Sequence, residues 1–145
     1  MVIIQKQKLE AKGEKFMLNK EEILELLEKY KKLVNTQDRE LFDEVFVNND
    51  QCNLIAITRH FSGRESIYND FLLGGIQKNY RFIELISDKI DVYEINNQLV
   101  NIIFKYHTNS LLRETNEPFG FEGLETQVIV KENGKWKIQH IHYSK

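Results

Sequence analysis

Residues 123–144 read GLETQVIVKENGKWKIQHIHYS, and apolar and polar side chains alternate along most of this stretch. A period of two predicts strands, here Gly123–Lys131 and Trp136–Tyr143, because successive side chains of a strand point to opposite faces. Asn133-Gly134 lies between the two strands and favours a tight turn, since both residue types tolerate a positive φ. The chain is therefore expected to close with an antiparallel hairpin.

The same period of two continues upstream of this hairpin. It predicts further strands at Phe82–Ile86, Ile90–Ile95 and Leu99–Thr108, with a tight turn at Asn96-Asn97. The segment Asn109–Phe119 holds the only proline of the chain and is expected to form a loop. The second half of the chain is thus predicted to be a meander of antiparallel strands.

The first half follows a helical period instead. Apolar side chains recur at helical spacing from Ile23 to Val34. Asn19 and Glu22 stand at capping-box spacing, so one amphipathic helix is expected to run to about residue 35. Further elements are expected as a short helix after Asp38, a strand at Cys52–Thr58 and a helix at Arg64–Gln77. Helices followed by antiparallel strands indicate an α+β fold, with residues 19–145 as a single domain and residues 1–18 as a loosely attached arm.

Three short motifs near the end of the chain carry a resemblance to a known family: Glu125-Thr126, Gly134-Lys135-Trp136 and His140-Ile141-His142-Tyr143-Ser144. In order and spacing they resemble the end of the association (hub) domain of calcium/calmodulin-dependent protein kinase II. The element order resembles the wider nuclear-transport-factor-like and SnoaL-like superfamily. This resemblance implies a cystatin-like, ketosteroid-isomerase-like cone, in which a curved antiparallel sheet wraps around the long first helix and leaves a pocket. It also implies that copies pair through the outer face of the sheet.

Composition excludes several classes of function. The 145 residues carry a formal charge of -2, so the chain lacks the basic field on which nucleic-acid binding depends. Its apolar runs are too short to span a bilayer, so no membrane partner is expected. A single cysteine excludes an internal disulfide and fits a reducing compartment, which favours a cytoplasmic protein. We expect no cofactor.

His140 and His142 lie two positions apart on a predicted strand, so they are expected to share a face with Trp136, Ile138 and Ser144. One interpretation is a pair of metal ligands, since imidazole binds zinc, copper or iron. The other is a hydrogen-bonded pair within the sheet or at a subunit contact. The sequence offers no third ligand at a suitable spacing, so no metal site is predicted.

The predicted pocket lining rests on the resemblance, because it follows from aligning the family's strands. The predicted lining residues are Ile67, Phe71, Ile103, Lys105, Gln127, Ile129, Ile141 and Tyr143. The kinase hub pocket is lined by arginines that suit a carboxylate, whereas Lys105, Gln127 and Tyr143 stand at those positions here. A lone lysine lacks the bidentate fork of arginine, so the expected guest is neutral or singly charged, with a ring or alkyl portion. An alternative places Lys105 and His107 near the strand end, in water.

Three residues are candidates for acid–base chemistry: Glu125, Tyr143 and His107. Glu125 would be a carboxylate base, and Tyr143 would donate to a developing oxyanion from the neighbouring strand. His107 would act as an acid or base beside Lys105. However, Glu125 also belongs to the Glu-Thr pair of the non-enzymatic hub domain, so this pair alone does not identify an enzyme.

Two functional hypotheses follow from these observations. The first is a non-catalytic, homo-oligomeric module, a homodimer or larger ring, that binds a small, largely apolar molecule or serves self-association. The second is a small SnoaL-like or ketosteroid-isomerase-like enzyme that catalyses proton transfer on an apolar cyclic substrate. Self-association would use the outer sheet face, where Val128, Val130, Trp136 and Ile138 are expected.

Overall fold

The order of elements follows the sequence pattern with two short strands added, one at the start of the chain and one just before the helix predicted at Arg64–Gln77. The computed structural model describes residues 2–4 and 20–144. Its helices are α2 (Lys20–Thr36), α3 (Arg39–Val45), α4 (Arg64–Ser66) and the π-helix η1 (Ile67–Gln77), which continues α4. Its strands are β1 (Val2–Ile4), β2 (Asn53–Ala56), β3 (Arg59–Ser62), β4 (Tyr80–Asn96), β5 (Leu99–Leu112), β6 (Glu122–Glu132) and β7 (Lys135–Ser144). Residues 1 and 5–18 of the predicted arm, and the predicted capping residue Asn19, lie outside the described residues.

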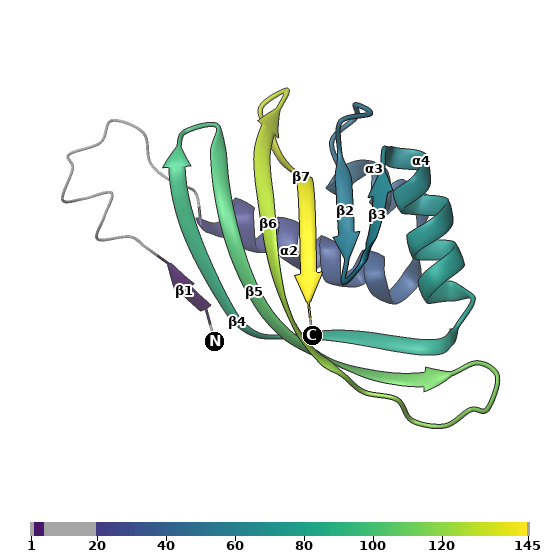
Figure 1. Cartoon of the computed structure of the whole chain (residues 1–145). Helices are drawn as coiled ribbons and strands as arrows, with labels where there is room; N and C mark the ends of the chain where they lie inside the picture. Colours follow the sequence, from purple (N-terminus) through teal and green to yellow (C-terminus); the bar gives the residue numbers. More distant parts are fainter. Residues whose placement is uncertain (1, 5–19, 145) are drawn as a thin grey trace.

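The seven described strands form one sheet in the order β1-β4-β5-β6-β7-β2-β3. The pairs from β4 to β7 and the β2–β3 pair are antiparallel, whereas β1 runs parallel to β4 and β2 runs parallel to β7. Figure 1 shows the sheet curving around the long helix α2. The predicted α+β class and the curved sheet around the first helix are confirmed. No helix within the described residues is long and apolar enough to cross a membrane.

Helix α2 is amphipathic, and its apolar side forms the centre of the core. The side chains it buries are Ile23, Leu26, Leu27, Tyr30, Leu33 and Val34. Strand β5 contributes the alternate residues Val100, Ile102, Phe104 and Tyr106, all of which are buried. Fully burying one large apolar side chain contributes about 1.5–3 kcal/mol, so this pairing of helix and sheet is the main source of stability.

The hairpin of β2 and β3 was only half predicted. The strand expected at Cys52–Thr58 ends at Ala56, and the chain turns back through Ile57 into β3. Ile57 has a φ of 58°, a conformation that is rare for a β-branched residue. No glycine or asparagine marks this turn, so the sequence carried no hairpin signal there.

Strand β4 is longer than predicted. The two strands expected at Phe82–Ile86 and Ile90–Ile95 are parts of one strand, which pairs with β5 along most of its length. The register shifts between Ser87 and Lys89, and this irregularity restarts the alternation of side chains. The interruption that the sequence pattern indicated is therefore a bulge within a strand, not a loop between strands.

Strand β7 contains a second irregularity, at Gln139. The residues on either side of it, Ile138 and His140, pair with consecutive residues of β6, so Gln139 is left out of the pairing. One extra residue exchanges the two faces of a strand. Trp136 and Ile138 are therefore buried together with Ile141, and the expectation that they share the outer face with His140 is wrong.

The core contact of α2 can be tested with Leu27, whose exposed fraction is 1%. Leu27→Ala should lower the free energy of unfolding by about 2–5 kcal/mol, because it removes buried surface and leaves a cavity. Lys32→Ala on the exposed side of the same helix should change it by no more than about 0.5 kcal/mol. Urea denaturation measures both values, and equal stability of the two variants would contradict this account of the core.

Candidate functional site

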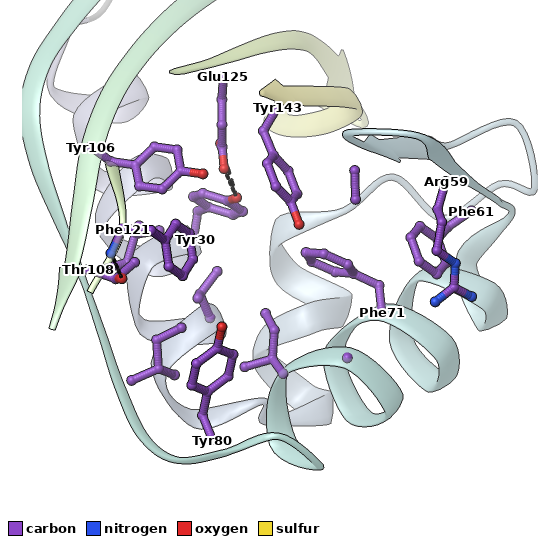
Figure 2. Close-up of a pocket in the computed structure, with 16 residues that line it drawn as sticks. Tyr30, Arg59, Phe61, Phe71, Tyr80, Tyr106, Thr108, Phe121, Glu125 and Tyr143 are labelled. Atoms are coloured by element: carbon purple, nitrogen blue, oxygen red, sulfur yellow. Dashed lines mark hydrogen bonds between the residues drawn. The ribbon is translucent and has the colours of Figure 1, made fainter. Parts of the chain in front are cut away.

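A cavity of about 240 Å³ opens between α2, η1 and the concave face of the sheet (Figure 2). Aromatic rings make up much of its wall, contributed by Tyr30, Phe61, Phe71, Tyr80, Tyr106, Phe121 and Tyr143. Among the described residues of the wall, only Glu125 and Arg59 carry a charge. A mostly apolar cavity with a few polar groups is the usual form of a small-molecule site.

Glu125 is the polar centre of this cavity. It comes from the concave face of β6, and its exposed fraction is 3%. The Tyr30 hydroxyl on α2 donates to its carboxylate, at 2.8 Å from Oε1 and 3.0 Å from Oε2. The Gln127 amide donates to Oε2 at 2.9 Å. Two elements that are 95 residues apart in sequence are thus joined by this carboxylate.

The cavity changes the acidity of the groups within it. Burial raises the pKa of Glu125 from 4.5 to about 7, although the hydrogen bonds from Gln127 and Tyr30 act in the opposite direction. Burial, with the nearby Glu125 charge, also raises the pKa of Tyr143 to about 12. The same two causes raise the pKa values of Tyr30 and Tyr106. At neutral pH the tyrosines therefore remain hydrogen-bond donors, while Glu125 populates both of its protonation states.

Tyr106 reaches the cavity because its neighbour on β6 is a glycine. Tyr106 pairs with Gly123 across the two strands, and a Cβ at residue 123 would overlap the tyrosine ring and hydroxyl. The ring also stacks on Phe104 and meets the edge of Phe121. The absence of a side chain at residue 123 therefore sets the position of this hydroxyl near Glu125 (Figure 2).

The predicted site residues fall into four groups, and three of these groups face the interior. Phe71, Tyr143 and the candidate base Glu125 line the cavity. Gln127 lies behind the wall and bonds to Glu125. Three others are fully buried in the core and do not line the cavity: Ile67, Ile129 and Ile141.

Ile103, Lys105 and His107 require a correction, because they lie on the outer face of β5. The even-numbered residues of this strand point into the core, from Val100 to Ser110. Lys105 is exposed, and His107 bonds through Nδ1 to the Asp88 carboxylate at 2.8 Å. The apolar side chains of β5 lie on its buried face. The prediction followed the family alignment instead of this pattern, and it therefore placed the opposite face in the pocket.

Sequence reasoning missed Tyr30, Tyr106 and Arg59 as residues of the cavity wall. Tyr30 follows the helical period of its apolar neighbours and reads as core. Tyr106 alternates with apolar residues of β5 in the same way. Their hydroxyls were nevertheless a signal, because a buried tyrosine usually needs a hydrogen-bond partner.

The histidines near the C-terminus take different environments. His140 Nδ1 lies 2.7 Å from Asn53 Oδ1 on the neighbouring strand, and burial lowers the pKa of His140. His142 is exposed on the same outer face. Within the described residues, no three side chains of His, Cys, Asp or Glu are grouped so that they could hold a metal ion. The geometry of His140 fits the hydrogen-bonded interpretation.

No family model and no curated protein matches the sequence. Solved structures do match the fold. One is a nuclear-transport-factor-2-like superfamily protein from Salmonella enterica serovar Typhimurium, with a TM-score of 0.81, 24% identity, and coverage of 86% of this chain and 88% of that chain. The chain has the nuclear-transport-factor-2-like fold.

Two further structures with this fold show how widely its sequences vary. A hexachlorocyclohexane dehydrochlorinase from Novosphingobium barchaimii has a TM-score of 0.73 and 13% identity, covering 94% of this chain and 87% of that chain. A protein with a cystatin-like fold from Caulobacter vibrioides has a TM-score of 0.71 and 17% identity, covering 86% and 87%. Such identities show the fold and leave the reaction to the site. The closer resemblance to the kinase hub domain stays a prediction from the sequence.

The raised pKa of Glu125 predicts a pH dependence of stability. Folding raises this pKa from 4.5 to about 7, so the folded state binds the extra proton between these values. The free energy of unfolding should therefore fall by about 3 kcal/mol as the pH rises from about 4.5 to above 7, relative to Glu125→Gln, which has no proton to lose. Urea denaturation of both proteins across this range gives the difference, and parallel pH profiles would contradict the assignment.

Proposed function

We propose that the protein transfers protons on a small, largely apolar ligand, with Glu125 as the catalytic acid–base group. The observation that carries this proposal is a buried carboxyl on the wall of an apolar cavity, with a pKa of about 7. A general base works best when its pKa lies near the working pH. Carboxyl groups with strongly shifted pKa values in clefts are also common at functional sites.

The residues around Glu125 suit removal of a proton next to a carbonyl group. The ionised carboxylate takes the proton from carbon, and the electron pair moves onto the carbonyl oxygen to form an enolate. Glu125 then returns the proton to the same carbon or to a conjugated one, so no other reactant is needed. The hydroxyls of Tyr106 and Tyr143 line the same cavity and can donate to the enolate oxygen.

Two observations support this function over binding without chemistry. A site that only held an apolar guest would not need a buried carboxyl, and desolvating this group costs stability. One structure with the same fold is an enzyme, the hexachlorocyclohexane dehydrochlorinase, which is named for a small apolar ring. Non-catalytic binding in the same cavity is the outcome that remains if the following test fails.

Deuterium exchange tests the proposal without knowledge of the natural ligand. 2-Tetralone is an uncharged bicyclic ketone with acidic C–H bonds, and its uptake of deuterium from D₂O can be followed by ¹H NMR. The protein should accelerate exchange above the buffer rate, and Glu125→Gln should reduce this acceleration by about a hundredfold or more. Glu122→Gln, an exposed residue of the same strand, is the matched control and should retain it.

Two results would overturn the proposal. The first is exchange no faster than in buffer alone, which would leave a non-catalytic binding module. The second is equal acceleration by the parent and Glu125→Gln, which would assign the proton transfer to another group.

We also propose self-association through the outer face of the sheet. Leu124 on this face has an exposed fraction of 48%. The partly buried Val128 of the same strand and Ile103 of the neighbouring strand β5 lie on the same face. Exposed apolar side chains on a sheet face that no described helix covers favour contact with a second copy, most often with twofold symmetry.

Light scattering at micromolar concentration measures this association. The parent should have at least twice the chain mass of 17.3 kDa, and Leu124→Arg should shift it towards the monomer because a buried charge at the contact is costly. Glu25→Arg, on the exposed side of α2, should leave the mass unchanged. A parent mass of 17.3 kDa would contradict self-association.

A further inference from the structure

Arg59 stands on the cavity wall at the side away from Glu125. It is the first residue of β3, at the edge of the sheet, and its side chain is exposed where Glu125 is buried. Figure 2 shows the guanidinium beside Phe61, on the other side of the cavity from the carboxyl. The two charged residues of the described wall therefore differ in exposure, with Glu125 buried and Arg59 on the solvent side of the cavity, here called its mouth.

The guanidinium of Arg59 has no polar partner among the described residues. It packs against an aromatic ring instead, since Cζ lies 4.7 Å from the centroid of the Phe61 ring. The other arginines are engaged: Arg39 with Glu65, Arg64 with Asp43, Arg113 with the carbonyls of Gln77 and Tyr80, and Arg81 with the carbonyl of Arg113. Stacking on Phe61 restricts the orientation of the Arg59 fork and leaves its N–H groups available.

We propose that Arg59 determines specificity by binding an anionic group of the ligand, of the carboxylate type, at the cavity mouth. The apolar body of the ligand then lies between the aromatic rings, and an uncharged polar end reaches Glu125. This inference rests on the proposed function of the same cavity. The expected ligands are small ring compounds with a single acidic group at one end.

The charges on the cavity wall determine the orientation in which such a ligand binds. An anion placed against Glu125 would put a second negative group into a desolvated site, and the described wall offers no cation at that end. At the mouth, the planar guanidinium can hold a carboxylate with two parallel hydrogen bonds. The ligand therefore binds with its charged end outward and its reacting carbon inward.

This role replaces the one that sequence reasoning gave to Lys105. That expectation placed a lone cation in the pocket without a bidentate fork. Lys105 lies on the outer face, and the cation of the wall is an arginine, which has the fork. Of the neutral or singly charged guests expected from the sequence, the proposed site selects the singly charged one and recognises its charge at Arg59.

A matched pair of probes tests the inference: 2-naphthoate, which is anionic, and 2-naphthamide, which has nearly the same shape without the charge. Calorimetric titration gives the Kd of each. Arg59→Gln should weaken naphthoate about tenfold, the effect of one charge-assisted contact at a partly solvated site. The same change should alter naphthamide binding by less than about twofold, and Arg81→Gln should leave both unchanged.

Three outcomes would overturn the inference: no binding of naphthoate to the parent at millimolar concentration, equal naphthoate affinity in the parent and Arg59→Gln, or an equal loss for both probes in that variant. Glu125→Gln separates this test from the test of the proposed function. It should keep or improve naphthoate binding while losing deuterium exchange. If naphthoate binding depends on Arg59 but the protein does not accelerate deuterium exchange, the role of Arg59 stands and the proposed function fails. If exchange depends on Glu125 but naphthoate binding does not depend on Arg59, the proposed function stands and this inference fails.

Discussion

The hydrogen bond from Tyr30 to Glu125 joins the long helix to the sheet inside a mostly apolar interior. A carboxyl that has lost its water must keep a donor, so the helix and strand β6 are held where these two side chains meet. The apolar residues around this contact contribute most of the stability, but they are less specific about relative position. The polar contact therefore constrains the geometry of the cavity as well as the acidity of the group within it.

Much of the fold was predictable because hydrophobic period and turn chemistry are local properties. The helical repeat from Ile23 to Val34 and the turn at Asn133-Gly134 each identified an element directly. The failures came where local signals were absent or misleading. Ile57 forms a turn although it is not a residue type that favours turns. The irregular region between Ser87 and Lys89 looks like a loop between two strands, although the pairing with β5 continues past it.

The site was less predictable, because it depends on which face of each strand is inside. Phe71, Tyr143 and the candidate base Glu125 lie on the cavity wall, whereas Lys105 and Ile103 were expected there and lie on the outer face. Tyr30, which bonds to Glu125, and Tyr106 line the same cavity and were not among the predicted residues. A carboxyl on one strand and a phenol on a helix 95 residues away come together only in three dimensions. The spacing of residues in the sequence does not reveal this contact. Nor does it reveal that the missing side chain at Gly123 leaves space for the Tyr106 ring.

The unpaired Gln139 marks a position of β7 where the strand can lose a residue without exchanging its two faces. Residues on the two sides of this position keep opposite parities: Trp136 and Ile138 face inward before it, and Ile141 and Tyr143 after it. Deleting this one residue would make Ile138 and His140 neighbours and restore regular pairing with β6, so Ile141 and Tyr143 would still face inward and the histidines outward. Natural relatives that lack a residue here would keep the same wall with an unbroken inward period, so a one-residue gap at this position is compatible with the same pocket architecture.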